Sequence, residues 1–333
     1  MPIDTHAHYV PPHLFDAART RGAALGVSVR DGAAPSIAFA YGFATRPMFA
    51  RLIEPVRDRR AWLDEQGIDR QLVATWPDMF GHGLAAPEGA GWHRMLNETL
   101  AEWTVEQSDR FDWIASVPLP HMEGSVAELE WAADHGAVGL VLPANVEGTN
   151  IGELALDPLW ARAAALGMPV LLHPVLVTPA PRASRFALAQ TTQYTFDTTL
   201  GAASLLATGV LERFPGLRLM LSHGGGALPW LIGRFDIMDA RMDRAAQKVI
   251  STRLPSNALR DLWLDTIVHH PAALRFLREV VGLDRMMLGT DYSFPPADLA
   301  PLLSFERAGF TPAEIRLISD EAPRALFSRL TKP

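Results

Sequence analysis

The sequence of 333 residues contains no cysteine. Disulfide bonds, thiolate nucleophiles and cysteine-based zinc sites are therefore excluded, so any metal ion has to be bound by His, Asp or Glu. No apolar run approaches the roughly 20 residues that a membrane-spanning helix needs, and the first residues lack the charged and apolar regions of a secretory signal. From these absences we expect a soluble cytoplasmic protein.

Charge of one sign is not concentrated anywhere in the chain. The formal net charge is −7 and the basic residues are scattered, which argues against nucleic acid or an anionic membrane as a partner and favours a small-molecule substrate. Hydrophobic residues make up 48% of the sequence, enough for a large core. We expect one domain over residues 1–333, although two domains would also fit this length.

Short apolar, β-branched runs alternate with segments of helical period, a pattern typical of βα units with a parallel sheet. The predicted strands are Ile3–His8, Gln71–Trp76, Trp113–Pro118, Val138–Pro143, Pro169–His173, Leu217–His223, Leu262–Val268 and Met286–Asp291. The predicted helices are 55–66, 92–107, 125–134, 158–165, 198–214, 229–245, 271–281 and 312–330. Asp157 and Thr311 each precede a proline and are predicted to cap their helices.

Eight strands with helices between them predict an α/β fold of the (β/α)8 TIM barrel type. A doubly wound open sheet is the alternative, but no Gly-x-Gly-x-x-Gly follows the first strand and no phosphate loop is present. Residues 11–53 contain two alternating stretches around Asp31-Gly32, which predict a small hairpin inserted after strand 1. This insert and the proline-rich loop 174–195 both leave strand ends, so we expect them to form walls or lids over an active site.

The segment "DTHAHY" places His6 and His8 one residue apart at the end of the first strand. Side chains at i and i+2 point to the same face of a strand, so both imidazoles should face the barrel interior, and Asp4 should share their side. Such a pair alone is weak evidence, because it also arises by chance and two hydrogen-bonded histidines would explain it. Other strand ends therefore decide its meaning.

Three further strands end in a candidate ligand or base, namely His173, His223 and Asp291. Parallel strands of a barrel all end on one rim, so these side chains should converge with the two histidines of strand 1. Three imidazoles and a carboxylate suit Zn²⁺ with an open position for water, although Mn²⁺, Fe²⁺ or Co²⁺ could occupy the same site. His269, after strand 7, is a minor candidate for a supporting role.

His223 can be considered separately from the other histidines. The three glycines that follow it let the backbone turn sharply and leave space beside the imidazole. Water activated by a metal needs a nearby proton acceptor, and histidine is the side chain with the closest unperturbed pKa. His223 is therefore interpreted as a general base and acid, with a fifth metal ligand as the alternative.

Four segments of the sequence resemble a known group of proteins. The segments "DTHAHYVP", "LLHP", "FPGLRLMLSHGGGALPWLIGRFD" and "DRMMLGTDYSFP" are similar to the amidohydrolase superfamily, in the branch of 2-amino-3-carboxymuconate-6-semialdehyde decarboxylase and related decarboxylases. The similarity runs from residue 1 to about residue 327. The resemblance implies that His6, His8, His173 and Asp291 bind the metal and that His223 is the acid/base residue, so His223 and Asp291 are the catalytic pair.

The resemblance also implies contacts with the substrate. Arg234 matches an arginine that binds a substrate carboxylate across a dimer interface, which implies a homodimer, and Phe294 matches an aromatic residue beside the substrate. A second substrate arginine of the family falls in the insert, where Arg46 and Arg51 both match it. The sequence departs from the family at Gln190, where the decarboxylase has a tryptophan, so the substrate need not be the same.

These residues imply a metal-dependent carboxy-lyase that decarboxylates an aromatic or muconate-type carboxylic acid without oxidation, using metal-activated water and a histidine acid/base. No organic cofactor is expected. The alternative is a metal-dependent hydrolase or hydratase that acts on a ring-cleavage product or a related small acid. A third reading is a barrel without catalysis that serves as a binding or scaffold protein, but the ligand set would then have no purpose.

Overall fold

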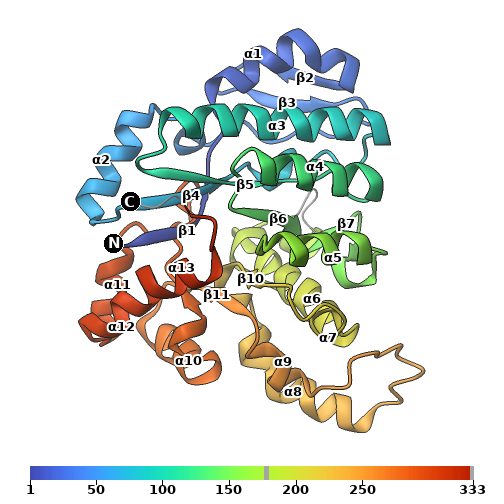
Figure 1. The fold of residues 1–333 in the computed structure, drawn as a ribbon, viewed down its shortest axis with the longest axis vertical. Helices are drawn as coiled ribbons and strands as arrows, with labels where there is room; N and C mark the ends of the chain where they lie inside the picture. Colours follow the sequence, from blue (N-terminus) through green and yellow to red (C-terminus); the bar gives the residue numbers. More distant parts are fainter. Residues whose placement is uncertain (176–179, 331–333) are drawn as a thin grey trace.

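A computed structural model describes residues 1–175 and 180–330 of the chain. Its main sheet has eight strands in the order β1-β4-β5-β6-β9-β10-β11-β12, and the pairings within it are all parallel. The strands are β1 Ile3–His8, β4 Arg70–Ala74, β5 Phe111–Ala115, β6 Gly139–Pro143, β9 Val170–His173, β10 Leu219–Leu221, β11 Trp263–Asp265 and β12 Met286–Met287. The prediction of eight strands in a (β/α)8 barrel is confirmed (Figure 1).

The first and last strands lie side by side and bring the sheet nearly to closure. Thr5 donates its backbone N–H to the carbonyl of Leu288 at 2.9 Å, and Asp291 donates to the carbonyl of His6 at 2.8 Å. Buried side chains from seven strands meet in one cluster, which only the barrel interior allows. They are Ile3, Leu72, Ile114, Val141, Leu171, Met220 and Met287.

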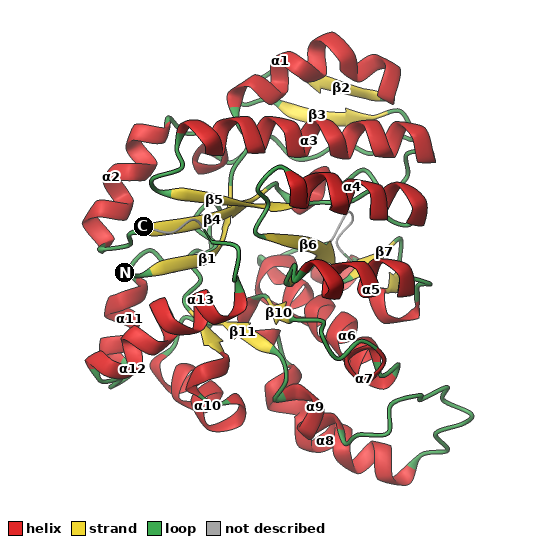
Figure 2. Ribbon diagram, viewed as in Figure 1, coloured by secondary structure: helices red, strands yellow, loops and turns green. Residues whose placement is uncertain are grey.

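Helices cover the outside of the barrel (Figure 2). They are α1 Pro12–Arg21, α2 Val56–Gln66, α3 Ala86–Glu106, α4 Met122–Asp134, α5 Asp157–Leu166, α6 Tyr194–Ala207, α7 Val210–Arg213, α8 Leu228–Arg241, α9 Pro255–Leu259, α10 Pro271–Val281, α11 Pro301–Arg307, α12 Pro312–Arg316 and α13 Ala322–Leu326. The helix predicted over 198–214 is two helices, because Gly209 adopts a left-handed conformation between them with φ +63°. No helix within the described ranges is both long and apolar enough to span a bilayer.

The two predicted helix caps have different outcomes. Thr311 begins α12 with a capping box, in which its hydroxyl accepts from the backbone of Glu314 and the Glu314 carboxylate accepts from the backbone of Thr311. The prediction for Asp157 is wrong. Asp157 is already the first residue of α5, and its carboxylate instead forms an ion pair with Arg213 at 2.5 Å. The guanidinium of Arg213 on α7 therefore binds the carboxylate that was predicted to cap α5.

The insert after β1 contains the predicted hairpin. Strands β2 Val27–Arg30 and β3 Ser36–Phe39 pair antiparallel, with Val27 opposite Phe39. Their apolar side chains pack with Trp92 and Met95 of α3 in a second buried cluster, and Figure 1 shows the hairpin and α1 above α3 at one end of the molecule. The hairpin is thus fixed to the outside of the barrel, while the rest of the insert returns to the rim.

Candidate metal centre and pocket

Four side chains meet at the carboxyl ends of the barrel strands. His6 and His8 lie on β1, His173 is the last residue of β9, and Asp291 follows β12. One ligand atom from each lies within 4.8 Å of those of the other three, and all four residues are buried. His6 and Asp291 lie more than 280 positions apart in the sequence, and the closure of β12 against β1 brings them together. The predicted metal ligands therefore form one cluster.

The expectation for Asp4 is wrong. The register between β1 and β4 shifts after Asp4, so Asp4 lies opposite Gln71 and Ala7 lies opposite Val73. Because Gln71 and Val73 share one face of β4, Asp4 shares its side with Ala7 and not with the histidines. Its carboxylate accepts hydrogen bonds from the Gln71 amide at 2.8 Å and from the backbone of Thr290 at 3.0 Å. Asp4 is therefore a structural residue that ties β1 to β4 and to the segment after β12.

The unpaired atoms of the cluster suit a divalent cation. Nε2 of His173 and Oδ1 of Asp291 are buried without a hydrogen-bond partner in residues 1–175 and 180–330. Nε2 of His6 and Nε2 of His8 are 3.1 Å apart and face the same point. Buried polar atoms without partners are rare, and imidazole nitrogens with a carboxylate oxygen are a donor set that zinc and related ions accept. The residues present therefore fit a metal ion.

The other ring nitrogens of the three histidines are held in place. Each Nδ1 lies next to an acceptor, which requires the proton on Nδ1 and leaves Nε2 free to bind a metal. The acceptors are Oδ2 of Asp265 at 2.6 Å for His6, the Thr75 carbonyl at 3.1 Å for His8 and the Pro174 carbonyl at 2.8 Å for His173. The tautomer needed for metal binding is thus fixed by the fold.

Sequence reasoning missed Asp265, the last residue of β11. Besides binding His6, its carboxylate accepts hydrogen bonds from the backbone of His223 at 2.9 Å and of Gly224 at 2.8 Å. No strand-end signal singled it out, because the predicted seventh strand ran on to Val268 and placed Asp265 in its interior, whereas the observed strand ends at Asp265. His269, considered instead, lines the pocket described below.

Burial and charge together set the protonation of the cluster. Burial lowers the pKa of His8 to about 3 and that of His173 well below its usual value, so both rings are neutral and able to act as ligands. Burial opposes protonation of His6 as well, but Asp265 and Asp291 outweigh it and raise the pKa. Burial would raise the pKa of Asp291, yet the neighbouring histidines lower it, so the carboxylate is ionised.

His223 lies beside the four clustered residues and is not one of them. Its Nε2 is 3.4 Å from Oδ2 of Asp291, and its Nδ1 has no partner within the described part of the chain. The backbone turns sharply here, with a positive φ of 54° at His223 and of 64° at Gly226. A side chain at Gly226 would place its Cβ 2.0 Å from the carbonyl oxygen of Thr195, so only glycine allows this close approach to α6.

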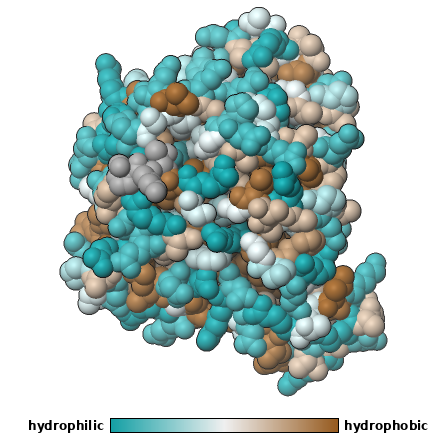
Figure 3. All heavy atoms as spheres, viewed as in Figure 1, coloured by the Kyte–Doolittle hydropathy of each residue, from teal (hydrophilic) through white to brown (hydrophobic). Residues whose placement is uncertain are grey.

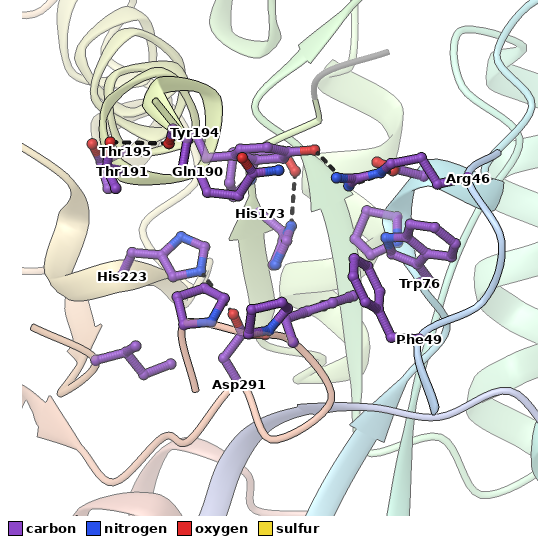
Figure 4. A pocket seen from close by; sticks show the side chains of 18 of the residues that line it. Arg46, Phe49, Trp76, His173, Gln190, Thr191, Tyr194, Thr195, His223 and Asp291 are labelled. Carbon is purple, nitrogen blue, oxygen red and sulfur yellow. Dashed lines mark hydrogen bonds and ion pairs between the residues drawn. The ribbon is translucent and has the colours of Figure 1, made fainter. Parts of the chain in front are cut away.

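The cluster lies at one end of a cavity of about 630 Å³. Figure 4 shows His223 and Asp291 at one end of this pocket and Arg46, Phe49 and Trp76 at the other. The insert contributes Arg46 and Phe49, and the loop 174–195 with the first turn of α6 contributes further wall residues, which are Ala187, Gln190, Thr191, Tyr194 and Thr195. Both long connections predicted as walls therefore do line the pocket.

The predicted substrate residues have different positions. Phe294 lines the pocket with its ring centroid 5.1 Å from that of His8, and Arg46 lines the far end. Arg51 is not among the lining residues, because its guanidinium lies over the ring of Tyr292 at 5.1 Å. Arg234 is exposed on α8 and does not line this pocket either. Of the two candidate arginines in the insert, Arg46 is the one that lines the cavity.

Comparison with known proteins places the chain in a class and then in a family. A barrel that gathers three imidazoles and a carboxylate at the carboxyl ends of its strands is built as a metal-dependent barrel enzyme. The sequence model of the amidohydrolase family matches residues 3–329, and the chain belongs to this family, in the branch of 2-amino-3-carboxymuconate-6-semialdehyde decarboxylase and related decarboxylases.

Two relatives and one solved structure illustrate this branch. The chain is 31% identical to 2-amino-3-carboxymuconate-6-semialdehyde decarboxylase of Dictyostelium discoideum over 72% of this chain and 67% of the relative. It is 28% identical to 6-methylsalicylic acid decarboxylase of Penicillium expansum over 98% and 96%. The fold is similar to that of dihydroxybenzoic acid decarboxylase from Polaromonas sp. JS666, with a TM-score of 0.78, 21% identity and coverage of 99% and 98%. That structure contains manganese and an inhibitor, 2-nitroresorcinol.

Proposed function

We propose that this protein is a metal-dependent, non-oxidative decarboxylase of an aromatic or muconate-type carboxylic acid. The observation that carries the proposal is the buried cluster of His6, His8, His173 and Asp291, with unpaired ligand atoms, at one end of the pocket. The relatives named above are decarboxylases of such acids, which supports the same reaction class. The proposed enzyme is a single-domain cytoplasmic protein that needs no organic cofactor.

The four clustered residues would hold the metal ion, for which Zn²⁺, Mn²⁺, Fe²⁺ and Co²⁺ are the candidates. When bound, the ion supplies positive charge that stabilises negative charge developing on the substrate and lowers the pKa of coordinated water. Manganese in the Polaromonas structure supports a divalent ion of this kind. The neutral rings of His8 and His173 and the ionised Asp291 are the protonation states that such binding requires.

His223 is the proposed proton donor. During decarboxylation the bond between the ring carbon and the carboxylate breaks, CO₂ leaves, and the electron pair stays on the ring carbon, which then takes a proton. His223 lies on the pocket wall, and Oδ2 of Asp291 accepts a hydrogen bond from its protonated Nε2 at 3.4 Å. The same carboxylate therefore orients the imidazole beside the cluster.

We further propose a homodimer in which Arg234 of each chain binds a carboxylate in the pocket of the other. Arg234 lies on α8 between three exposed apolar side chains, Trp230, Ile237 and Met238. Trp230 is 76% exposed, which is a large apolar area to leave in water. Figure 1 shows α8 and the loop after it projecting from the barrel, and Figure 3 shows hydrophobic and hydrophilic residues mixed on this projecting part. The guanidinium would bind the carboxylate through two parallel hydrogen bonds.

The test is a screen of hydroxybenzoates, aminobenzoates and ring-cleavage acids against purified protein loaded with each candidate metal, with CO₂ release as the readout. CO₂ release that stops when a chelator is added and returns with the metal supports the proposal. Incorporation of labelled water into a product without CO₂ release would show a hydrolase or hydratase instead. His223→Ala serves as a matched variant, which should keep its metal and lose turnover, whereas loss of the metal would make His223 a ligand.

A further inference from the structure

The end of the pocket far from the metal cluster contains three polar side chains that contact one another. Nη2 of Arg46 lies 3.4 Å from Oδ2 of Asp78 and 3.3 Å from the hydroxyl of Tyr194. Arg46 comes from the insert, Asp78 follows β4 and Tyr194 begins α6, so three separate segments meet here. All three residues line the cavity, and Figure 4 shows the side chains of Arg46 and Tyr194 pointing toward each other. We call Arg46, Asp78 and Tyr194 the distal polar group.

The charge of Arg46 is balanced within the distal polar group. The side chain of Asp78 is only 7% exposed, and it forms an ion pair with the Arg46 guanidinium. Burial raises the pKa of Asp78 to about 6, and the charge of Arg46 works against this rise, so the carboxylate is mostly ionised at neutral pH and above. Tyr194 is uncharged, because burial raises the pKa of its hydroxyl. The group as a whole is therefore neutral when the enzyme works near neutral pH.

Within one chain, no other arginine or lysine in the described part of the pocket wall compensates for this pairing. Arg46 is the one arginine or lysine among the lining residues that the structure describes, and Arg51 is turned toward Tyr292. A second carboxylate at this end of a substrate would lose its hydration and lie close to the Asp78 carboxylate, and the two negative charges would repel each other. A hydroxyl group fits the distal polar group better, since the guanidinium can donate to it and the carboxylate can accept from it.

The wall between the two ends favours a flat apolar body. Trp76, Phe49 and Phe294 form one side of the pocket, with ring centroids of Phe49 and Phe294 5.4 Å apart and of Trp76 and Phe294 6.1 Å apart. Aromatic rings stack against such a surface at low entropic cost. A benzene ring with its carboxylate toward the metal cluster would lie along this side and present its opposite edge to the distal polar group.

We infer that the substrate is an aromatic monocarboxylic acid with a neutral hydroxyl group at the end far from the metal, and that Asp78 sets this specificity by neutralising Arg46. This inference rests on the proposed decarboxylase function and narrows it to hydroxybenzoate-type acids over muconate-type dicarboxylates. Asp78 would act as a specificity-determining residue, since it contacts the far substituent and not the reacting carbon.

The test compares 2,4-dihydroxybenzoate with 2-hydroxyterephthalate, which carries a carboxylate in place of the 4-hydroxyl. The metal-loaded wild type should have a kcat/KM at least tenfold higher for the dihydroxy acid. Asp78→Asn leaves Arg46 unpaired and should shift this ratio about tenfold or more toward the dicarboxylate, and adding Arg46→Gln should cancel the shift. Arg234 is unchanged in the wild type and in both variants, so it does not contribute to the difference between their ratios of kcat/KM.

Two further variants keep the result interpretable. Asp58→Asn changes an exposed carboxylate on α2 and should leave the ratio unchanged. Tyr194→Phe removes one hydroxyl without altering charge, and should lower kcat/KM for the dihydroxy acid several-fold while the dicarboxylate is little affected. Should Asp78→Asn fail to fold, equal losses for both acids in Tyr194→Phe would overturn the inference.

Failure of the inference can be told apart from failure of the proposed function. Absence of CO₂ release from both acids counts against the decarboxylase, and the binding of each acid, measured by titration calorimetry, then tests the inference by itself. A wild type that binds or turns over the dicarboxylate better, or an Asp78→Asn variant that folds and keeps the wild-type ratio, would overturn the role of Asp78.

Discussion

The metal cluster and the distal polar group lie at the two ends of one pocket and are built differently. Three of the clustered residues lie on barrel strands, and the second nitrogen of each histidine is bound to a carbonyl or to Asp265. The distal polar group comes largely from the insert and the start of α6, and the Arg46 side chain is 46% exposed. The strand ends therefore hold the reacting groups in place, while the connections between strands determine which acid fits the pocket.

A buried arginine supports the metal end. Arg59 is fully buried and donates to the carbonyl of His8 at 2.9 Å and to the hydroxyl of Ser293, two residues after Asp291, at 3.0 Å. It also donates to Gln71 at 2.9 Å, whose amide in turn donates to Asp4. This chain of hydrogen bonds ties the strands that hold the clustered residues to one another. The distal end has no comparable framework within the described residues.

The largest expected effect follows from removing one clustered residue. His173→Ala deletes an imidazole that the metal needs and should lower bound metal below one tenth of the wild-type content and turnover by at least a thousandfold. Metal content by emission spectroscopy and CO₂ release measure the two losses. His135→Ala, an exposed histidine that stacks on Trp131, is the control and should change neither. Full metal content in His173→Ala would separate this residue from the cluster.

A smaller effect is expected one step away from the metal. Asp265→Asn keeps the shape of the side chain but weakens the charged hydrogen bond that orients His6, so metal affinity should fall about 10- to 100-fold. Competition with a fluorescent chelator measures this affinity. Asp284→Asn, an exposed carboxylate, is the matched control. An unchanged affinity in Asp265→Asn would mean that the strand alone orients the ring of His6.

A substitution in the pocket wall should weaken substrate binding and leave metal binding unchanged. Phe294→Ala removes an aromatic surface beside the substrate and should raise KM roughly tenfold, because the apolar contact area lost on binding corresponds to one or two kcal/mol, while metal affinity stays within about twofold of the wild type. Phe186→Ala, an exposed phenylalanine in the loop 174–195, is the control. A loss of metal in Phe294→Ala as large as that in Asp265→Asn would erase the distinction between the two ends.

The smallest effect is expected outside both ends of the pocket. Thr311→Ala removes the capping box of α12 and should lower the free energy of unfolding by about 1 kcal/mol, with no change in metal affinity or KM. Chemical denaturation measures the stability. Thr311→Ser keeps the hydroxyl and should restore most of the loss. A change in KM would show that the outer helices are coupled to the pocket.

The sequence allowed the barrel and the four clustered residues to be predicted because both follow from simple repeats. Strand ends recur at one rim, so His173 and Asp291 could be placed next to His6 from their positions alone. The register shift in β1 left no mark in the alternation of side chains, and for that reason Asp4 was assigned to the wrong side. Asp265 was missed because the predicted seventh strand ran past it to Val268, so it did not stand at a predicted strand end.

The far end of the pocket was harder to predict for a physical reason. The contact between Arg46, Asp78 and Tyr194 depends on the path of an insert whose conformation is set by packing on α3, and no local periodicity encodes such a path. The resemblance left Arg46 and Arg51 equivalent. Only their side-chain positions separated them, because Arg51 lies over an aromatic ring behind the pocket wall.

The seam between β1 and β12 has a consequence for how the protein is made. Thr5 and Leu288, which pair across the seam, are separated by 283 positions, and Asp291 lies just beyond it. Translation releases His6 and His8 long before Asp291, so the nascent barrel has two unpaired edges and an incomplete set of candidate metal ligands until β12 and Asp291 have emerged. The proposed metal site is therefore completed only when β12 closes against β1, and an ion bound there would link the two strands of the seam.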